Sequence, residues 1–237
     1  MSVPSLGNLL VVGAHPDDET FTAAGLMAAA VREGRRVVCV TATRGEGGSM
    51  DPEKWPPASM AEVRSREMRE CMDVLGVEEH HFLGYVDGTC HEVDHEEGTE
   101  RILTFMREIQ PDSVLTFGPD GMTGHPDHKA ISSWTTTAFA REAKEGARLF
   151  YATQTPGWVE RFVPVMNRFN VFGPGTPPVV PVEDLAIHLT LEGDLLDQKV
   201  RAIYKQISQV EHMIEAFGEE FFTEGMAEES FVEAPSP

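Results

Sequence analysis

Two short segments of the sequence, "AHPDDE" at 14–19 and "GHPDH" at 124–128, crowd histidine and carboxylate side chains together. Carboxylates held this close repel one another and are costly to desolvate without a partner. A divalent cation would supply the missing positive charge, because imidazole and carboxylate groups are suitable ligands for zinc. The pool of candidate ligands and acid–base groups is His15, Asp17, Asp18, Glu19, His125, Asp127 and His128.

Such a pool can support hydrolysis. Two histidines and one carboxylate leave coordination positions open, as a catalytic metal site requires. Water bound at such a site becomes acidic enough to attack a carbonyl near neutral pH. A spare carboxylate can accept its proton, and a spare histidine can stabilise the oxyanion or protonate the leaving group. Either motif alone could be a turn at the end of a strand with capping aspartates. The hypothesis of a hydrolytic metal site therefore depends on the presence of both motifs.

The elements around the two motifs predict how they meet. Each motif follows a short apolar run, "NLLVVGA" (8–14) or "SVLTFG" (113–118), of the kind that forms a buried strand. Further strands are predicted at 35–43, 80–85, 148–155 and 185–191, and helices at 21–34, 59–75, 99–110, after His128 and at 194–217. This alternation indicates an α/β fold, Rossmann-like and doubly wound, with a mainly parallel sheet of order 3-2-1-4-5 and helices on both faces.

In that strand order the first and fourth strands are neighbours. Ligands in such sheets bind outside the carboxyl ends of the strands, at the point where the order reverses. Both motifs are therefore expected in one crevice. The whole chain, 1–237, is interpreted as a single domain. Within it, the proline-containing segment 156–190 is interpreted as loop-rich and as facing the substrate, and 218–237 as an acidic, mobile tail.

Composition excludes several classes of function. A formal net charge of −20 should repel nucleic acid and anionic membrane surfaces. No apolar run approaches the roughly 18 residues that a membrane span needs, and the N-terminus lacks the basic region of a signal peptide. The three cysteines, Cys39, Cys71 and Cys90, form no CxxC pair. We therefore expect a cytoplasmic protein with reduced thiols and no nucleic-acid or membrane partner.

The motifs also resemble those of a known family. "AHPDDE" and "GHPDH" are similar to the metal-site motifs of the LmbE-like, or PIG-L-type, zinc-dependent N-acetylglucosaminyl deacetylases. The likeness continues in order through "TRGEGG" (43–48), "RSREMRECMDVLG" (64–76), "FLGYVDG" (82–88) and "KVRAIYKQISQ" (199–209). It spans nearly the whole chain and is weakest at 156–190.

This resemblance implies a role for individual residues. It makes His15, Asp18 and His128 the metal ligands, whereas the residues alone leave the choice between Asp17 and Asp18 open. It makes Asp17 the general base and His125 the group that stabilises the tetrahedral intermediate and can also act as the acid. It makes Arg64 a substrate contact. The implied enzyme is a zinc-dependent deacetylase acting on a small amino-sugar conjugate.

Some alternatives stay open at this stage. Some family members have a tyrosine where this chain has Thr123, so that tyrosine's role is absent or filled from elsewhere. Two histidines and a carboxylate also bind iron(II). The resemblance leaves open whether the protein forms a homo-oligomer. The competing functions are a nucleotide-binding protein, against which the missing G-x-G-x-x-G argues, and a non-catalytic metal-binding protein, which would not need Asp17 and His125.

Overall fold

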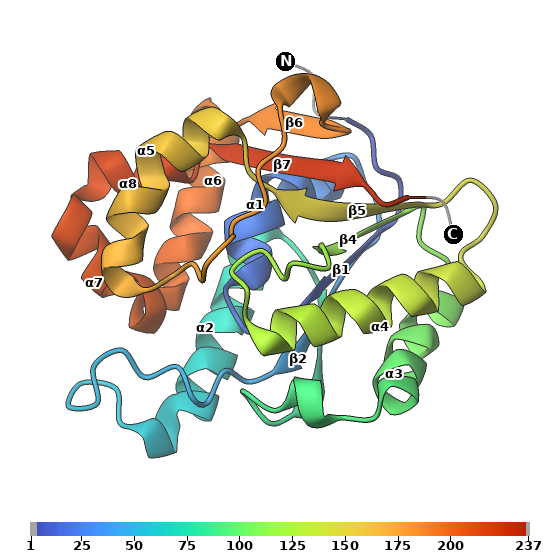
Figure 1. The fold of residues 1–237 in the computed structure, drawn as a ribbon, viewed down its shortest axis with the longest axis horizontal. Helices are drawn as coiled ribbons and strands as arrows, with labels where there is room; N and C mark the ends of the chain where they lie inside the picture. The colour runs from blue at the N-terminus through green and yellow to red at the C-terminus, as the bar shows by residue number, and fades with distance from the viewer. Residues whose placement is uncertain (1–3, 236–237) are drawn as a thin grey trace.

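The computed structural model describes residues 4–235, which form a seven-stranded sheet flanked by helices (Figure 1). The strands are β1 (Leu9–Gly13), β2 (Val37–Thr43), β3 (Glu79–Tyr85), β4 (Ser113–Phe117), β5 (Arg148–Thr153), β6 (Ile187–Thr190) and β7 (Glu228–Glu233). The α-helices are α1 (Asp18–Arg32), α2 (Met60–Leu75), α3 (His95–Ile109), α4 (Pro126–Glu142), α5 (Pro156–Met166), α6 (Gly193–Ile203), α7 (Ile207–Phe217) and α8 (Glu219–Gly225).

The sheet confirms the predicted α/β class and the predicted order of its parallel strands. Its order is β3-β2-β1-β4-β5-β7-β6, and β1 pairs in parallel with both β2 and β4. The structure adds two strands at one edge, because β7 pairs antiparallel with β5 and with β6. The first and fourth strands are thus neighbours, and both motifs follow the same end of the sheet.

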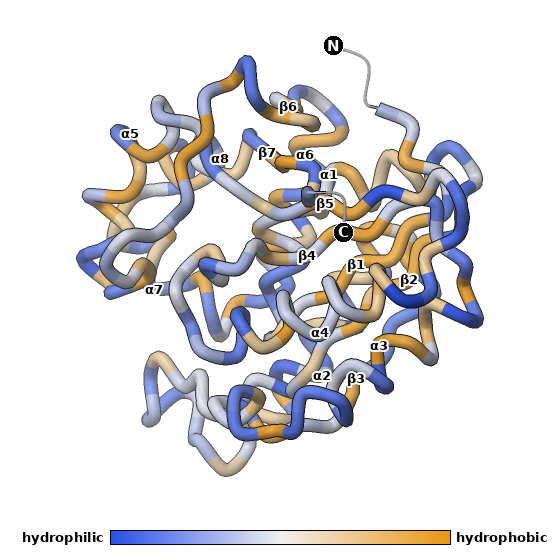
Figure 2. The backbone as a smooth tube through the Cα atoms, turned by 45° about the vertical axis from the view of Figure 1, so that its right-hand side comes forward, coloured by the Kyte–Doolittle hydropathy of each residue, from blue (hydrophilic) through white to orange (hydrophobic). Residues whose placement is uncertain are grey.

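The central strands are apolar because both faces of the sheet are covered. Every residue of β1, β2 and β4 is buried, as expected for parallel strands between two helical layers. Helices α3 and α4 pack together on one face, and α1, α2 and α6 pack on the other (Figure 1). Figure 2 shows the hydrophobic residues concentrated in these central strands.

The interpretation of the last twenty residues as a mobile acidic tail is wrong for the described part. Helix α8 and strand β7 occupy it, and Phe231 of β7 is 1% exposed. The acidic composition misleads because Glu229 is buried against a cation from a distant helix, Lys199. The final residues, 236–237, lie outside the described residues.

The segment 156–190 is also more regular than predicted. It contains helix α5 in addition to the expected strand, which is β6. The single helix expected at 194–217 is divided into α6 and α7 by one turn of 3-10 helix at Tyr204–Gln206. The helix expected at 59–75 is α2, and the side chain of Ser59, which precedes it, makes no cap hydrogen bond.

Helices α5, α7 and α8 build a second apolar cluster beside the main core (Figure 1). Trp158, Phe162, Met213 and Phe222 are among its buried members. This cluster lies next to the end of the sheet where the motifs are, because several of its side chains line the same cavity as the motif residues. The sheet therefore positions the motif residues, and the helical cluster contributes apolar side chains to the same cavity.

Candidate metal and catalytic site

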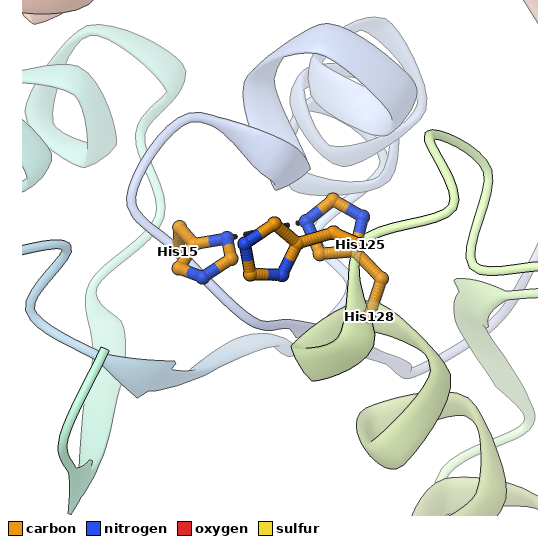
Figure 3. Close-up of side chains that lie close together, drawn as sticks. All are labelled: His15, His125 and His128. Carbon is orange, nitrogen blue, oxygen red and sulfur yellow. Dashed lines mark hydrogen bonds between the residues drawn. The ribbon is translucent and has the colours of Figure 1, made fainter. Parts of the chain in front are cut away.

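Three imidazoles meet at the carboxyl ends of β1 and β4. His15 follows β1, while His125 and His128 begin α4 after β4. Figure 3 shows the three rings gathered at one point, with His125 just before and His128 within the first turn of one helix. The ring centroids of His15 lie 4.7 Å from His125 and 5.1 Å from His128. The crevice predicted from the sequence is therefore present.

Side-chain atoms of His15, Asp18 and His128 lie close together. Nδ1 of His15 lies 3.1 Å from Nε2 of His128, which lies 3.3 Å from Oδ1 of Asp18. Nδ1 of His15 lies 3.7 Å from Oδ2 of Asp18. Ligand atoms about 2.0–2.1 Å from a tetrahedral zinc would be about 3.3 Å apart. His15, His125 and His128 together present ligand atoms close enough to hold one ion, and Asp18 lies beside two of them.

The second nitrogen of His15 is held by carboxylates. Nε2 of His15 lies 3.0 Å from Oδ1 of Asp87 and 3.3 Å from Oδ2 of Asp127. Burial lowers the pKa of His15, but the contacts with Asp127 and Asp87 and the charge of Asp18 outweigh it and raise the pKa to about 10. These carboxylates place a proton on Nε2 and leave Nδ1 to bind either a second proton or a metal ion.

The second nitrogen of His128 is also fixed. Its Nδ1 donates to the carbonyl oxygen of Gly121 at 2.9 Å, which leaves the lone pair on Nε2. Its ring stacks on Phe117 with centroids 4.2 Å apart. Burial lowers the pKa of His128 to about 4. A neutral imidazole with its free lone pair aimed at His15 and Asp18 is the form that ligates metals.

Asp18 is oriented by the backbone of its own motif. The amide groups of Ala14 and His15 donate to its Oδ2 at 2.8 and 2.7 Å. One oxygen is thereby occupied and the other, Oδ1, faces His128. The neighbouring Asp17 makes none of these contacts. This difference in geometry favours Asp18 over Asp17 as the ligand, a choice that the residue types alone could not make.

Asp17 sits on a strained turn and points at Arg64. Its backbone has φ +125°, a conformation that residues other than glycine rarely adopt. Its Oδ2 accepts a hydrogen bond from Nη2 of Arg64 at 2.9 Å. Burial raises the pKa of Asp17 to about 7, although the charge of Arg64 opposes this shift. A carboxylate near this pKa is suited to take and return a proton at neutral pH.

Arg64 is held in place by the "TRGEGG" loop. Besides Asp17, it donates to the carbonyl oxygens of Gly45 (3.0 Å) and Pro16. A Cβ atom at Gly45 or at Gly48 would lie 2.2 or 2.4 Å from Nη1 of Arg64. Glycine at these two positions is therefore explained by the room that the guanidinium needs. Arg64 is 3% exposed and borders the cavity, so it contacts Asp17 first and a substrate only at its edge.

His125 precedes the first turn of α4 as its N-cap. Its Nδ1 accepts a hydrogen bond from the amide of Asp127 at 3.1 Å, so the ring proton is placed on Nε2. Burial and the charge of His15 lower the pKa of His125. The structure thus presents a neutral hydrogen-bond donor at this position.

The six residues to which the resemblance gives a role border one cavity of about 560 Å3, whereas Glu19 and Asp127 of the candidate pool do not. The six are His15, Asp17, Asp18, Arg64, His125 and His128. Thr123 also lines it, with Oγ1 3.2 Å from Nδ1 of His128. Within 4–235, which includes all three tyrosines of the chain, no tyrosine borders the cavity. The tyrosine of some family members therefore has no replacement there.

Sequence reasoning missed Asp87, which contacts His15 and borders the cavity. The one feature of the sequence that could have pointed to Asp87 is its position within "FLGYVDG", a segment that resembles the family. Glu19, another member of the candidate pool, does not line the cavity; it is buried and accepts hydrogen bonds from Thr20 and Gln206. The three cysteines are free and buried. Over the described range, no helix combines the length and hydropathy that crossing a membrane requires.

Comparison with known proteins gives a family for this site. Residues 10–139 match the family model described as GlcNAc-PI de-N-acetylase, or PIG-L. The chain is 31% identical over 242 residues to a 1D-myo-inositol 2-acetamido-2-deoxy-alpha-D-glucopyranoside deacetylase of Rhodococcus erythropolis, covering 87% of this chain and 82% of that protein. A deacetylase of the same name from Kineococcus radiotolerans is 34% identical over 168 residues, but the match spans 59% of this chain and only 46% of that relative.

Solved structures share the fold at lower identity. An N,N'-diacetylchitobiose deacetylase from Pyrococcus horikoshii superposes with a TM-score of 0.68 at 21% identity, covering 98% of this chain and 85% of that one. A 4-carboxy-2-hydroxymuconate hydratase from Pseudomonas putida superposes with a TM-score of 0.63 at 15% identity, covering 98% of each chain. At this level of identity the likeness establishes the fold, and one fold carries different reactions.

Proposed function

The chain belongs to the GlcNAc-PI de-N-acetylase (PIG-L) family, and on that premise we propose that it is a metal-dependent hydrolase acting on an N-acetylglucosamine-type amino sugar. It would remove the N-acetyl group and release acetate. The observation that carries the proposal is the convergence of His15, Asp18 and His128 beside Asp17 and His125 at one end of a cavity. The names of the relatives support deacetylation and an amino-sugar conjugate as substrate.

We assign the metal ligands to Nδ1 of His15, Oδ1 of Asp18 and Nε2 of His128. Three protein ligands leave a position open for substrate or water, as catalytic zinc sites do. Zinc suits this donor set best, and iron(II) is the alternative. When bound, the ion supplies the positive charge that makes water nucleophilic near neutral pH and polarises the amide carbonyl.

Asp17 is assigned the proton transfers. Its partly exposed carboxylate borders the cavity beside the ligands, and its raised pKa places it between acid and base at neutral pH. It would accept the proton of the attacking water and then give that proton to the departing amine. Arg64 keeps one oxygen of Asp17 in a fixed direction, which leaves the other oxygen to face the substrate.

We assign His125 the stabilisation of the oxyanion. The hydrogen bond from the amide of Asp127 fixes its Nδ1 as an acceptor, so Nε2 carries a proton that it can donate. Such a bond strengthens as negative charge develops on the carbonyl oxygen. Because the pKa of His125 is lowered, we assign it hydrogen bonding from the neutral ring, and not donation of a proton to the amine.

A decisive experiment is an acetate-release assay on purified protein with a panel of N-acetylglucosamine conjugates, with metal analysis of the same sample. Substoichiometric metal and no acetate from any conjugate would refute the proposal. Full metal content without acetate release would favour the non-catalytic alternative. The predicted cytoplasmic location and the homo-oligomer stay predictions.

A further inference from the structure

The cavity is lined by polar and by apolar side chains. The polar ones include the motif residues described above. Six of the apolar ones, which we call the apolar wall, come from the C-terminal half of the chain: Trp158, Met166, Phe169, Phe172, Met213 and Met226. They come from α5 and the residues after it, from α7, and from the end of α8. Four of its six residues, Trp158, Met166, Phe169 and Phe172, lie in the segment 156–190, which least resembles the family.

The apolar wall is a fixed surface backed by its own core. Trp158 packs against Phe162 with ring centroids 5.4 Å apart, and its Nε1 donates to the carbonyl oxygen of Gly225 at 2.9 Å. The one polar atom of the indole is thus satisfied within the protein. Met166, Met213 and Met226 are between 3% and 8% exposed. Methionine side chains adapt to the shape of an apolar ligand.

Charge at the cavity disfavours an anionic ligand. Among the cavity-lining residues of 4–235, Arg64 is the one lysine or arginine, and Asp17 already binds it. Four carboxylates line the same space, those of Asp17, Asp18, Asp87 and Glu228. Apart from the metal ion proposed above, a phosphate or carboxylate on the substrate would meet these groups without a free lysine or arginine side chain to balance its charge.

We infer, on the basis of the deacetylase function proposed above, that the substrate is an amino sugar carrying a neutral alkyl or aryl group that binds against the apolar wall. This group could be the aglycone or an N-acyl chain longer than acetyl. A polyol placed against the phenylalanine and methionine side chains of the wall would find no hydrogen-bond partners among them, although Gln154, Gln209 and His212 also line the cavity. The inference therefore departs from the inositol conjugates named for the relatives.

The test compares wild-type kcat/KM across matched substrates: methyl, butyl and hexyl glycosides of N-acetylglucosamine, the corresponding N-hexanoyl methyl glycoside, and N-acetylglucosamine 1-phosphate. Each methylene that becomes buried should raise kcat/KM about fourfold. The inference predicts that kcat/KM rises at least tenfold either from the methyl to the hexyl glycoside or from the N-acetyl to the N-hexanoyl methyl glycoside. It also predicts a low kcat/KM for N-acetylglucosamine 1-phosphate. Equal rates for methyl and extended substrates in both series would overturn it. No turnover of any compound would instead count against the deacetylase function itself.

A pair of variants tests the wall directly. Phe169 lines the cavity, whereas Phe221 is half-buried in the same cluster and does not line it. Phe169→Ser should reduce the hexyl-to-methyl ratio of kcat/KM at least threefold, and Phe221→Ser should leave that ratio as in wild type. An unchanged ratio in Phe169→Ser, or an equal loss in both variants, would remove the wall from substrate binding. The wild-type series decides the inference even if a variant fails to fold.

Discussion

Nδ1 of His15 and Nε2 of His128 lie 3.1 Å apart, and each is the ring nitrogen that its neighbours leave without a hydrogen-bond partner of its own. Carboxylates hold the far side of His15, and the carbonyl oxygen of Gly121 holds the far side of His128. Two lone pairs directed at each other are stable only with a cation between them, whether proton or metal. Metal binding should therefore depend on the protonation state of these two imidazole rings.

The first prediction follows from this pair. His128→Ala should lose metal and activity together, because one of three ligands is removed. Metal analysis after dialysis gives the content, and thermal unfolding with added zinc gives a second readout. An ion at a hundredfold excess over its Kd stabilises the folded state by about 2.7 kcal/mol, so wild type should shift in Tm and the variant should not. His81→Ala, on the exposed side of β3, is the control. Full metal content in His128→Ala would remove His128 from the ligand set.

The second prediction separates the two aspartates. Asp17→Asn should retain the metal and slow turnover by about 10²- to 10⁴-fold, because the base is lost. Its fold should tolerate the change, since asparagine accepts positive φ more readily than most residues. Asp18→Asn should lose metal, because its amide oxygen must face the N–H groups of Ala14 and His15 and its NH2 group would then face the ion. The reverse pattern of metal loss would exchange the two assignments.

The third prediction concerns pH. A lowered pKa means that His125 becomes neutral at a lower pH than usual, and a bound cation would lower its pKa further. Its donating form therefore persists as pH rises through neutrality, and the alkaline limb of the rate profile should not belong to it. His125→Ala should bind metal normally and lose mainly kcat, with the alkaline limb unmoved. A limb that disappears in this variant would show that a protonated His125 takes part in the reaction.

The fourth prediction concerns the loop that accommodates Arg64. Gly48→Ala should displace the guanidinium, because the added Cβ would lie 2.4 Å from Nη1, and Asp17 would lose its partner. We expect kcat to fall at least tenfold with metal content retained. Gly157→Ala is the control, since a Cβ there meets nothing within 4 Å. Normal kcat in a folded Gly48→Ala variant would show that Arg64 does not orient Asp17.

The fifth prediction concerns stability. Lys199 and Glu229 form an ion pair at 2.8 Å with no exposure of either side chain. Glu229 also accepts from the amides of Gly25 and Leu26 inside α1, and Lys199 donates to the carbonyl oxygen of Phe21. Lys199→Met should destabilise the fold by about 3–5 kcal/mol in urea unfolding, because a charge stays buried without its partner. Adding Glu229→Gln should restore part of the loss; purely additive losses would contradict this account.

The parts of the molecule that the sequence could predict depend on local patterns. Apolar runs before each motif indicate buried strands, and their alternation with helices implies the order that brings His15 and His128 together. Strand β7 could not be predicted, because its acidic residues look solvated until Lys199, far away in the sequence, neutralises Glu229. The choice of Asp18 over Asp17 depends on backbone geometry within the motif. The role of Asp87 could not be predicted, because its contact with His15 joins two segments that share no local sequence pattern.

The position of β7 has a consequence for how the molecule is made. It is the last strand of the described chain, yet it lies between β5 and β6 in the sheet. During synthesis from the N-terminus, every motif residue leaves the ribosome long before β7 does. Until then β5 has an open edge that invites pairing with other chains, and β6 has no neighbour in the sheet. During synthesis, the candidate ligand residues should therefore be present early. The nascent chain should be protected from aggregation only after β7 has been made and has paired with β5.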